Sequence, residues 1–294
     1  MLCKSIPLRW ETAPFPSTGE HFGSNALHRG DSHFAAQAEF PFLCFAKACP
    51  TRIICMKGCD LMTGRIHSIQ SLGAVDGPGV RCVVFLQGCP LRCVYCHNPD
   101  TWDPTGGEEI DTDALVRRVL RFRPYWKNGG GVTVSGGEPL LQAPFVAEFF
   151  QKLHEQGVHT ALDTSGTGCP TAAAERVLRH TDLVLCDLKF LTAADYRRYC
   201  RADLAQVERF LQLTAMKRVP LWVRHVVVPG LTDDPEHLRL VKARAESCPN
   251  LEKLEFLPFH KLCIEKYDRM GLDFPLRDTP AMNEAWLKQL LSKL

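Results

Sequence analysis

From about residue 64 onward, short apolar runs alternate with segments whose apolar residues recur every three or four positions. The short runs are rich in β-branched residues and are only four to eight residues long, which is typical of buried strands. They predict strands at 82–86, 132–135, 160–163, 183–187, 221–228 and 253–257. The amphipathic segments predict helices at 113–125, 143–156, 171–179, 193–199, 204–217, 235–247 and 280–294.

The repeated alternation of strand and helix predicts an α/β fold with a parallel sheet and helices on the outside. The predicted interior strands are nearly continuous apolar runs, as expected when helices cover both faces of a sheet. A doubly wound sheet and a barrel both fit this pattern. The length of the patterned region favours something short of a complete eight-fold barrel, which typically needs about 250 residues.

Residues 1–61 lack any sustained period and scatter Pro, Gly, Ser, His and five cysteines. We interpret them as a disordered extension or as a stretch translated from a start codon assigned too early, with Met56 and Met62 as alternative starts. A transit peptide is the second interpretation, although acidic residues such as Glu11, Glu20, Asp31 and Glu39 count against it. The predicted domains are therefore 1–61 as an irregular extension and 62–294 as the folded unit.

The composition narrows the class of protein. The chain has 294 residues, 45% of them hydrophobic, and a formal charge of +2, which gives no reason to expect nucleic acid or an anionic membrane as a partner. No apolar run reaches the roughly 18 residues of a spanning helix, which favours a soluble protein. The 14 cysteines come without a signal-peptide pattern, so we expect a reducing compartment, with the cytoplasm as the default and an organelle as the alternative if the extension is a transit peptide.

Polar residues follow five of the predicted strands. They are Ser135-Gly-Gly-Glu138, Asp163-Thr164, Asp187 with Lys189, Pro258-Phe-His260, and the cysteine-containing stretch that follows FLQ. Because the carboxyl ends of parallel strands meet at one edge of a sheet or barrel, these groups are expected to share one mouth. The sequence thus predicts an active site at that edge.

Cys89, Cys93 and Cys96 have the spacing C-x3-C-x2-C and are followed by His97. The four side chains could form a zinc site, but adjacent residues such as Cys96 and His97 rarely converge on one tetrahedral ion. An iron–sulfur cluster held by three thiolates is the favoured alternative. One iron then has no protein ligand and can bind a molecule that brings its own amine and carboxylate, as S-adenosylmethionine does.

Several longer stretches carry a specific resemblance. GRIHSIQSLGAVDGPGVR, GCPLRCVYCHNPDTW, GGGVTVSGGEPLL, ALDTSG, DLVLCDLK, WVRHVVVPG and LEFLPFH occur in this order from about Thr63 onward. The chain resembles the radical S-adenosylmethionine superfamily and, within it, the family that activates pyruvate formate-lyase. The resemblance implies a partial (β/α)6 barrel and does not cover residues 1–61.

The resemblance also implies roles for particular residues. Cys89, Cys93 and Cys96 match the catalytic [4Fe-4S] ligands. The implied cofactor-binding residues are Tyr95, Cys96, His97, Gly136, Gly137, Glu138, Asp187, Leu188, Lys189, Arg224 and His260. The implied ligands of a monovalent cation are Asp163, Thr164, Leu185 (through its backbone) and Asp187. Asp76 matches a position that contacts the substrate peptide, although Asp-Gly-Pro-Gly is also a good turn by itself.

The implied reaction is reductive cleavage of S-adenosylmethionine to a 5′-deoxyadenosyl radical, which removes hydrogen from a glycine of pyruvate formate-lyase. Flavodoxin or ferredoxin is the expected electron donor, and we expect a monomer. Three alternatives remain open: an activating enzyme for another glycyl-radical enzyme, a radical enzyme acting on a small molecule, and a zinc-stabilised binding module without catalysis. The cysteine-free segment between Cys96 and Ser135 disfavours the first, because several such enzymes carry an inserted cluster domain there.

Overall fold

The structure is a computed structural model that describes residues 62–294, so the predictions for residues 1–61 lie outside it. Eight strands form one sheet in the order β3-β1-β2-β4-β5-β6-β7-β8. Their bounds are β1 Thr63–Gly73, β2 Arg81–Leu86, β3 Glu108–Asp111, β4 Gly131–Gly136, β5 His159–Thr164, β6 Leu183–Asp187, β7 Leu221–Val227 and β8 Leu251–Pro258. Strands β2 and β4 to β8 are parallel neighbours, whereas β1 and β3 add an antiparallel edge.

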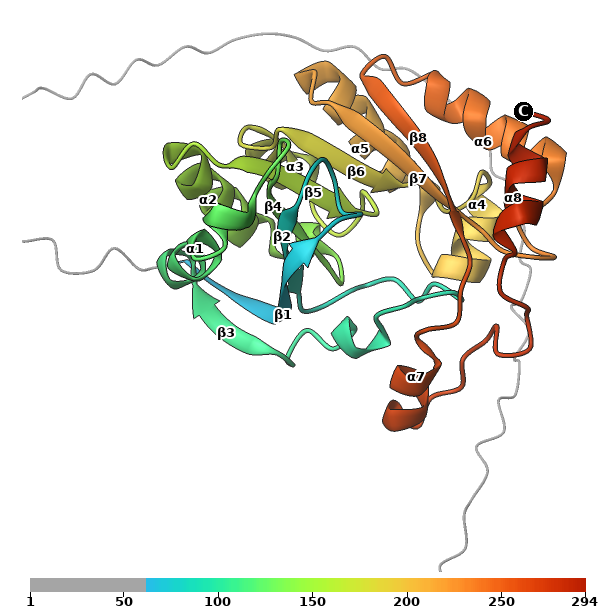
Figure 1. Cartoon of the computed structure of the whole chain (residues 1–294), viewed down its shortest axis with the longest axis horizontal. Coiled ribbons are helices and arrows are strands. Elements are labelled where there is room, and N and C mark those ends of the chain that lie inside the picture. The colour runs from blue at the N-terminus through green and yellow to red at the C-terminus, as the bar shows by residue number, and fades with distance from the viewer. Residues whose placement is uncertain (1–61) are drawn as a thin grey trace, which may run out of the picture. The chain divides into compact units, whose positions relative to one another are not determined.

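Helices connect the parallel strands and cover the outer side of the curved sheet (Figure 1). They are α1 Thr112–Leu120, α2 Ala143–Glu155, α3 Thr171–Leu178, α4 Ala193–Asp195, α5 Leu204–Lys217 and α6 Pro235–Glu246, whereas α7 Ile264–Met270 and α8 Glu284–Leu291 follow β8. Within residues 62–294 the pairing ends at β3 and β8, so the sheet curves without closing. The predicted partial barrel with six parallel strands is confirmed. None of the described helices is long and apolar enough to cross a membrane.

All six predicted strands are confirmed, but the antiparallel edge was missed. In β1 the more buried positions hold polar as well as apolar residues, so burial does not follow the hydrophobic pattern. Strand β3 has the sequence EEID, and none of its residues is fully buried. These two strands lie outside the parallel core and therefore lack the continuous apolar runs that revealed the others. Their place in the sheet is set by pairing with β2 and with each other.

Three predicted helices differ from the observed ones for local reasons. The helix expected over 113–125 ends at Leu120 and is followed by a short 3-10 turn that contains Pro124. The one expected over 193–199 is a single turn, α4, followed by a π-turn at Tyr196–Cys200. The C-terminal helix begins only at Glu284, where the Asn283 side chain accepts a hydrogen bond from the Trp286 amide.

Candidate active site at the strand ends

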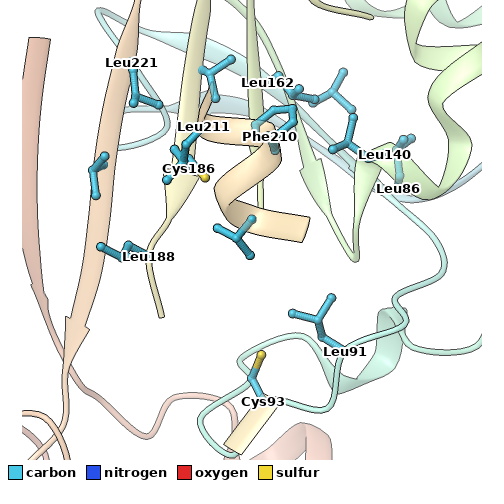
Figure 2. Close-up of a cluster of buried hydrophobic side chains, with 14 of the residues drawn as sticks. Leu86, Leu91, Cys93, Leu140, Leu162, Cys186, Leu188, Phe210, Leu211 and Leu221 are labelled. Carbon is cyan, nitrogen blue, oxygen red and sulfur yellow. The ribbon is translucent and has the colours of Figure 1, made fainter. Parts of the chain in front are cut away.

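The loop that carries the three cysteines, residues 88–102, follows β2 directly and will be called the cysteine loop. It contains no regular element except a 3-10 turn at Pro99–Thr101. Cys93 is buried, and Cys89 and Cys96 are partly exposed. In Figure 2 the Cys93 sulfur points from the loop toward the buried side chains of the sheet interior. The structure therefore places this thiol at the mouth of the partial barrel, as predicted.

Backbone hydrogen bonds from distant segments fix this irregular loop. The Arg92 amide donates to the Cys200 carbonyl at 2.8 Å, and the Val94 amide donates to the Tyr199 carbonyl at 2.9 Å. On the other side, the Tyr267 hydroxyl donates to the Cys96 carbonyl at 3.2 Å. The loop is thus held between the π-turn and α7, two segments more than 100 residues away in the chain.

The donor chemistry of the loop fits an iron–sulfur cluster. Burial raises the pKa of Cys89 to about 12 and that of Cys96 to about 11, so both carry protons that ligation must displace. Within residues 62–294 no three His, Cys, Asp or Glu side chains yet converge closely enough to hold a metal ion. Three thiols on one loop are nevertheless the donor set that such clusters use.

Gly136 and Gly137 bring the end of β4 against the cysteine loop. A Cβ atom on Gly136 would lie 2.3 Å from the Leu86 nitrogen, and one on Gly137 would lie 2.2 Å from the Gly88 carbonyl oxygen. Gly136 also has a φ of 110°, which side-chain-bearing residues rarely adopt. The close approach lets the Gly137 amide donate to the Leu86 carbonyl at 2.9 Å. The close packing of β4 against β2 and the cysteine loop therefore requires glycine at both positions. The contact of these glycines with a cofactor stays a prediction.

Glu138 joins two loops beneath this mouth. Its side chain is 1% exposed and accepts hydrogen bonds from the Leu140 amide, the Thr164 hydroxyl, and the amide and hydroxyl of Ser165. Burial raises its pKa even though these four donors oppose the shift. The carboxylate is thus buried and bonded to the segments that follow β4 and β5, so it supports the mouth from beneath.

Four charged side chains form what will be called the charged cluster at the ends of β5, β6 and β7: Asp163, Asp187, Lys189 and Arg224. The β6–β7 register pairs Asp187 with Arg224. Arg224 forms ion pairs with Asp163 and, at 3.2 Å, with Asp187, and Lys189 pairs with Asp187 at 2.9 Å. Two carboxylates and two cations thus meet on the mouth, and their formal charges cancel.

The charged cluster gives its two carboxyl groups opposite pKa shifts. Burial raises the pKa of Asp163 to about 6. Burial also acts on Asp187, but Lys189 and Arg224 outweigh it and hold the pKa of Asp187 at about 2. The difference follows from geometry, because Asp187 contacts two cations whereas Asp163 contacts Arg224 alone.

The residues predicted to bind a monovalent cation lie close together but are engaged with other groups. Asp163 and Asp187 both face the Arg224 guanidinium, and the Thr164 hydroxyl donates to Glu138. The Leu185 side chain is buried beside Ala161, Leu183 and Trp222. A cationic side chain already sits between the two carboxylates, so the cation site stays a prediction and no chemical step is derived from it.

The remaining predicted site residues surround the same mouth. The His97 and His260 rings lie 4.1 Å apart between centroids, and a ring nitrogen of His97 is 2.9 Å from the His260 carbonyl oxygen. The Tyr95 hydroxyl is buried and has no hydrogen-bond partner among the described residues. Leu188 is 2% exposed, and its carbonyl oxygen is 2.7 Å from Nδ1 of His225. A bound molecule could supply the hydrogen-bond partner that the buried Tyr95 hydroxyl lacks among the described residues.

Asp76 comes from the turn between β1 and β2 and reaches the same region. Burial raises its pKa, and the positive charge of Arg224 opposes the shift. Its carbonyl oxygen accepts a hydrogen bond from the Thr133 hydroxyl at 2.7 Å. The structure therefore brings Asp76 beside the charged cluster, although 87 residues or more separate it from each member in the sequence.

Several residues of the site were not identified from the sequence. The Ser135 hydroxyl donates to Asp163 at 2.6 Å, and Lys266 binds the Asn98 and Asp100 side chains beyond the cysteines. Cys200 also lies against the cysteine loop, because its carbonyl oxygen accepts a hydrogen bond from the Arg92 amide. For Ser135, its position at the end of a predicted strand was a sequence signal of a place in the site. For Lys266 and Cys200 the sequence holds no such signal, because tertiary packing alone brings them to the site.

A cavity of about 850 Å³ lies next to the cysteine loop rather than in the mouth. Pro90 and Leu91 of the loop, the segment after β5, and residues of α5 line it. Arg197, Arg201 and Arg209 also line it, and all three are exposed. The cysteine loop thus lies between the mouth and this cavity, whose rim carries the three arginines.

Comparison with known proteins agrees with this site. A family model described as a 4Fe-4S single cluster domain matches residues 75–204, which include the cysteine loop. The pyruvate formate-lyase-activating enzyme of Clostridium pasteurianum is 46% identical over 239 residues, covering 79% of this chain and 100% of that protein. The enzyme of the same name from Staphylococcus aureus (strain USA300) is 42% identical, covering 78% of this chain and 94% of that protein.

Among solved structures, Streptococcus suis SuiB bound to S-adenosylmethionine matches 70% of this chain and 44% of its own, with a TM-score of 0.51 and 12% identity. At that identity the likeness concerns the fold alone. The two sequence relatives go further, because the chain spans nearly all of each at more than 40% identity. Since its cysteine loop and strand-end residues also form one site, the chain belongs to the family of pyruvate formate-lyase-activating enzymes.

Proposed function

We propose that this chain activates pyruvate formate-lyase by generating a glycyl radical on it, with a [4Fe-4S] cluster and S-adenosylmethionine as cofactors. The observation that carries the proposal is the match along the whole length of a relative of that name, together with the three thiols of the loop that follows β2. When bound, the reduced cluster supplies the electron that cleaves S-adenosylmethionine to the radical which removes hydrogen from glycine.

In this proposal the residues of the chain bind the cofactors and orient them toward the substrate. Cys89, Cys93 and Cys96 release their protons and ligate the cluster. Lys189 and Arg224 hold N–H donors at the mouth, and these donors would receive a carboxylate of S-adenosylmethionine although both side chains are also paired with carboxylates of the chain. The His97 and His260 rings, whose centroids lie 4.1 Å apart and whose planes are inclined by 31°, offer aromatic surface for the adenine.

The acceptor of the radical is a glycine in a peptide, which has no side chain to block its approach to the mouth. Asp76 stands at the rim beside Arg224, where a peptide would pass. The work of the protein is to hold the reacting atoms close together and to keep water out while the radical exists.

We further propose a small flavodoxin or ferredoxin as electron donor and a monomeric, cytoplasmic enzyme. What supports a protein donor is the exposed arginine surface beside the cysteine loop, formed by Arg197, Arg201 and Arg209. Positive charge next to the cluster attracts an acidic partner and speeds its encounter at low salt. Light scattering of the purified chain tests the monomeric state.

The decisive experiment uses protein reconstituted with iron and sulfide without oxygen. It is reduced with S-adenosylmethionine and pyruvate formate-lyase, and the electron paramagnetic resonance spectrum is recorded. A glycyl-radical doublet on the lyase is the expected result. Formation of 5′-deoxyadenosine without the doublet would show that the radical acts on another substrate. A protein that holds zinc and no iron–sulfur cluster would instead favour the zinc-stabilised binding module without catalysis.

A further inference from the structure

The turn between β1 and β2, residues 74–80, carries Asp76 but consists of bends without regular structure. Val75, which precedes Asp76, is 79% exposed. The turn thus offers an apolar side chain next to a carboxylate, which is a surface that a peptide can contact. Since no helix or strand fixes the shape of this segment, residues outside the turn have to hold it.

Arg81, the first residue of β2, holds the turn from the interior. It is fully buried, and its guanidinium donates to the carbonyl oxygens of Pro78 at 3.2 Å, Gly129 at 3.3 Å and Val132 at 2.8 Å. Every hydrogen bond that it makes within the described residues goes to a carbonyl, a hydroxyl or an imidazole. The guanidinium therefore ties the backbone of the turn to the backbone around the start of β4.

Thr133 links Arg81 to Asp76. Its Oγ1 lies 2.6 Å from Nε of Arg81 and 2.7 Å from the Asp76 carbonyl oxygen. A guanidinium can only donate, so the hydroxyl accepts from Arg81 and gives its own proton to the Asp76 carbonyl. Thr133 is fully buried on β4. A regular strand thus fixes the hydroxyl that holds the backbone of Asp76.

The side chain of Asp76 packs against the end of β1. A Cβ atom on Gly73 would lie 2.7 Å from Oδ2 of Asp76 and 2.6 Å from a methyl carbon of Val83. Glycine at that position therefore lets the carboxylate approach the strand. Asp76 is held on two sides, through its carbonyl by Thr133 and through its side chain by the end of β1.

We propose that Thr133 and Arg81 are positioning residues for the protein substrate, which hold the turn 74–80 so that Asp76 contacts the peptide that contains the reacting glycine. The proposal rests on the proposed function, in which Asp76 stands where that peptide passes. Neither residue touches the substrate, because both act through the backbone of the turn. A turn that is ordered before the substrate arrives loses less conformational entropy on binding.

The test compares wild type with three variants and a control. Thr133→Val keeps the shape of the side chain without the hydroxyl, Thr133→Ser keeps the hydroxyl, and Arg81→Lys keeps the charge without the planar fork of donors. The matched control is Thr214→Val on α5. Thr214 is also fully buried, and its hydroxyl also accepts from a side-chain N–H, that of Asn250, and donates to a carbonyl, that of Leu211.

Two quantities are measured on the reconstituted enzyme: the KM for pyruvate formate-lyase, from initial rates of glycyl-radical formation, and the hydrogen–deuterium exchange of the amides of residues 74–80. In Thr133→Val the KM should rise roughly five- to tenfold, as expected for one buried hydrogen bond, and exchange should become faster. Arg81→Lys should change both quantities in the same direction. Thr133→Ser and Thr214→Val should stay near wild type.

Formation of 5′-deoxyadenosine in the absence of the lyase should equal the wild-type value in Thr133→Val, because the substitution touches neither the cysteine loop nor the charged cluster. An unchanged KM or an unchanged exchange rate in that variant overturns the proposal. So does a Thr133→Ser variant that behaves like Thr133→Val, since the hydroxyl would then not be the group that holds the turn. If Arg81→Lys does not fold, the two Thr133 variants decide.

The wild-type measurement separates this proposal from the proposed function. A wild-type enzyme that forms no glycyl radical on the lyase contradicts the proposed function and, with it, the substrate that the turn is said to meet. A wild-type enzyme that forms the radical, with Thr133→Val indistinguishable from it, contradicts only the positioning role of Thr133 and Arg81.

Discussion

The cysteine loop and the charged cluster face the same mouth but are held in different ways. The charged cluster stands on regular strands, and the β6–β7 register alone places Asp187 beside Arg224. The cysteine loop has almost no regular structure and depends on backbone hydrogen bonds to the π-turn and on the Tyr267 hydroxyl. The first is therefore placed by the regular pairing of the sheet, whereas the second is placed by a few tertiary hydrogen bonds.

This difference matters for chemistry. Positively charged groups that receive a carboxylate have to be in place before the ligand arrives, because their reorganisation would weaken binding. Thiols that ligate a cluster instead form their final geometry with the metal, since ligation also requires loss of protons whose pKa burial has raised. The predictions below test the two regions separately.

The largest expected effect is loss of the cluster in Cys93→Ser. A hydroxyl is a poor ligand for iron in such clusters, so two thiolates remain where three are needed. Iron and sulfide content should fall to background and 5′-deoxyadenosine formation should stop. Cys248→Ser is the control and should retain both; full activity in Cys93→Ser would contradict the ligand assignment.

Next in size is a loss of stability in Glu138→Ala. The substitution leaves four hydrogen-bond donors without their acceptor in the interior, which costs roughly 3 kcal/mol. Denaturant unfolding of the cluster-free protein measures it. Glu236→Ala, which removes an exposed carboxylate paired with Arg239, should change the free energy of unfolding by less than about 0.5 kcal/mol.

A smaller effect is expected in how the free energy of unfolding falls at acid pH, which will be called the acid limb. The pKa of Asp187 is held at about 2, because Lys189 and Arg224 outweigh its burial. Its contribution is therefore complete above the ordinary value of 3.8 and is lost as pH falls from there toward 2. The free energy of unfolding, measured from pH 3.8 down to about pH 2, should show this loss.

Two variants make the acid-limb prediction specific. Asp187→Asn should remove this part of the pH dependence, because the titrating group is gone. Lys189→Met should make the loss smaller and complete it at a higher pH, because one of the two cations that lower the pKa of Asp187 is absent. An acid limb identical in wild type and in both variants would show that the charged cluster does not act as described.

The smallest effect is expected from deletion of residues 1–61. The described residues 62–294 contain every member of both regions, and the Clostridium pasteurianum relative is matched along its whole length by 79% of this chain. The melting temperature and 5′-deoxyadenosine formation should equal those of the full chain. A truncated protein that fails to fold would show that the extension is structural.

Much of the fold could be predicted because the parallel strands are buried on both faces. That burial requires runs such as VTV and LVLC, and every such run is a strand of the structure. The edge strands β1 and β3 could not be found in the same way. Their residues are partly exposed, so they carry no continuous apolar pattern and are defined by their pairing partners.

The sequence by itself determined the chemistry of this protein, because thiols at C-x3-C-x2-C and charged residues after strands are local features of the chain. Tertiary structure alone decided how these groups meet. It turned Glu138 inward as a support, placed Arg224 between Asp163 and Asp187, and laid Cys200 against the cysteine loop. Contacts between residues far apart in the chain depend on strand register and loop packing, which no local pattern encodes.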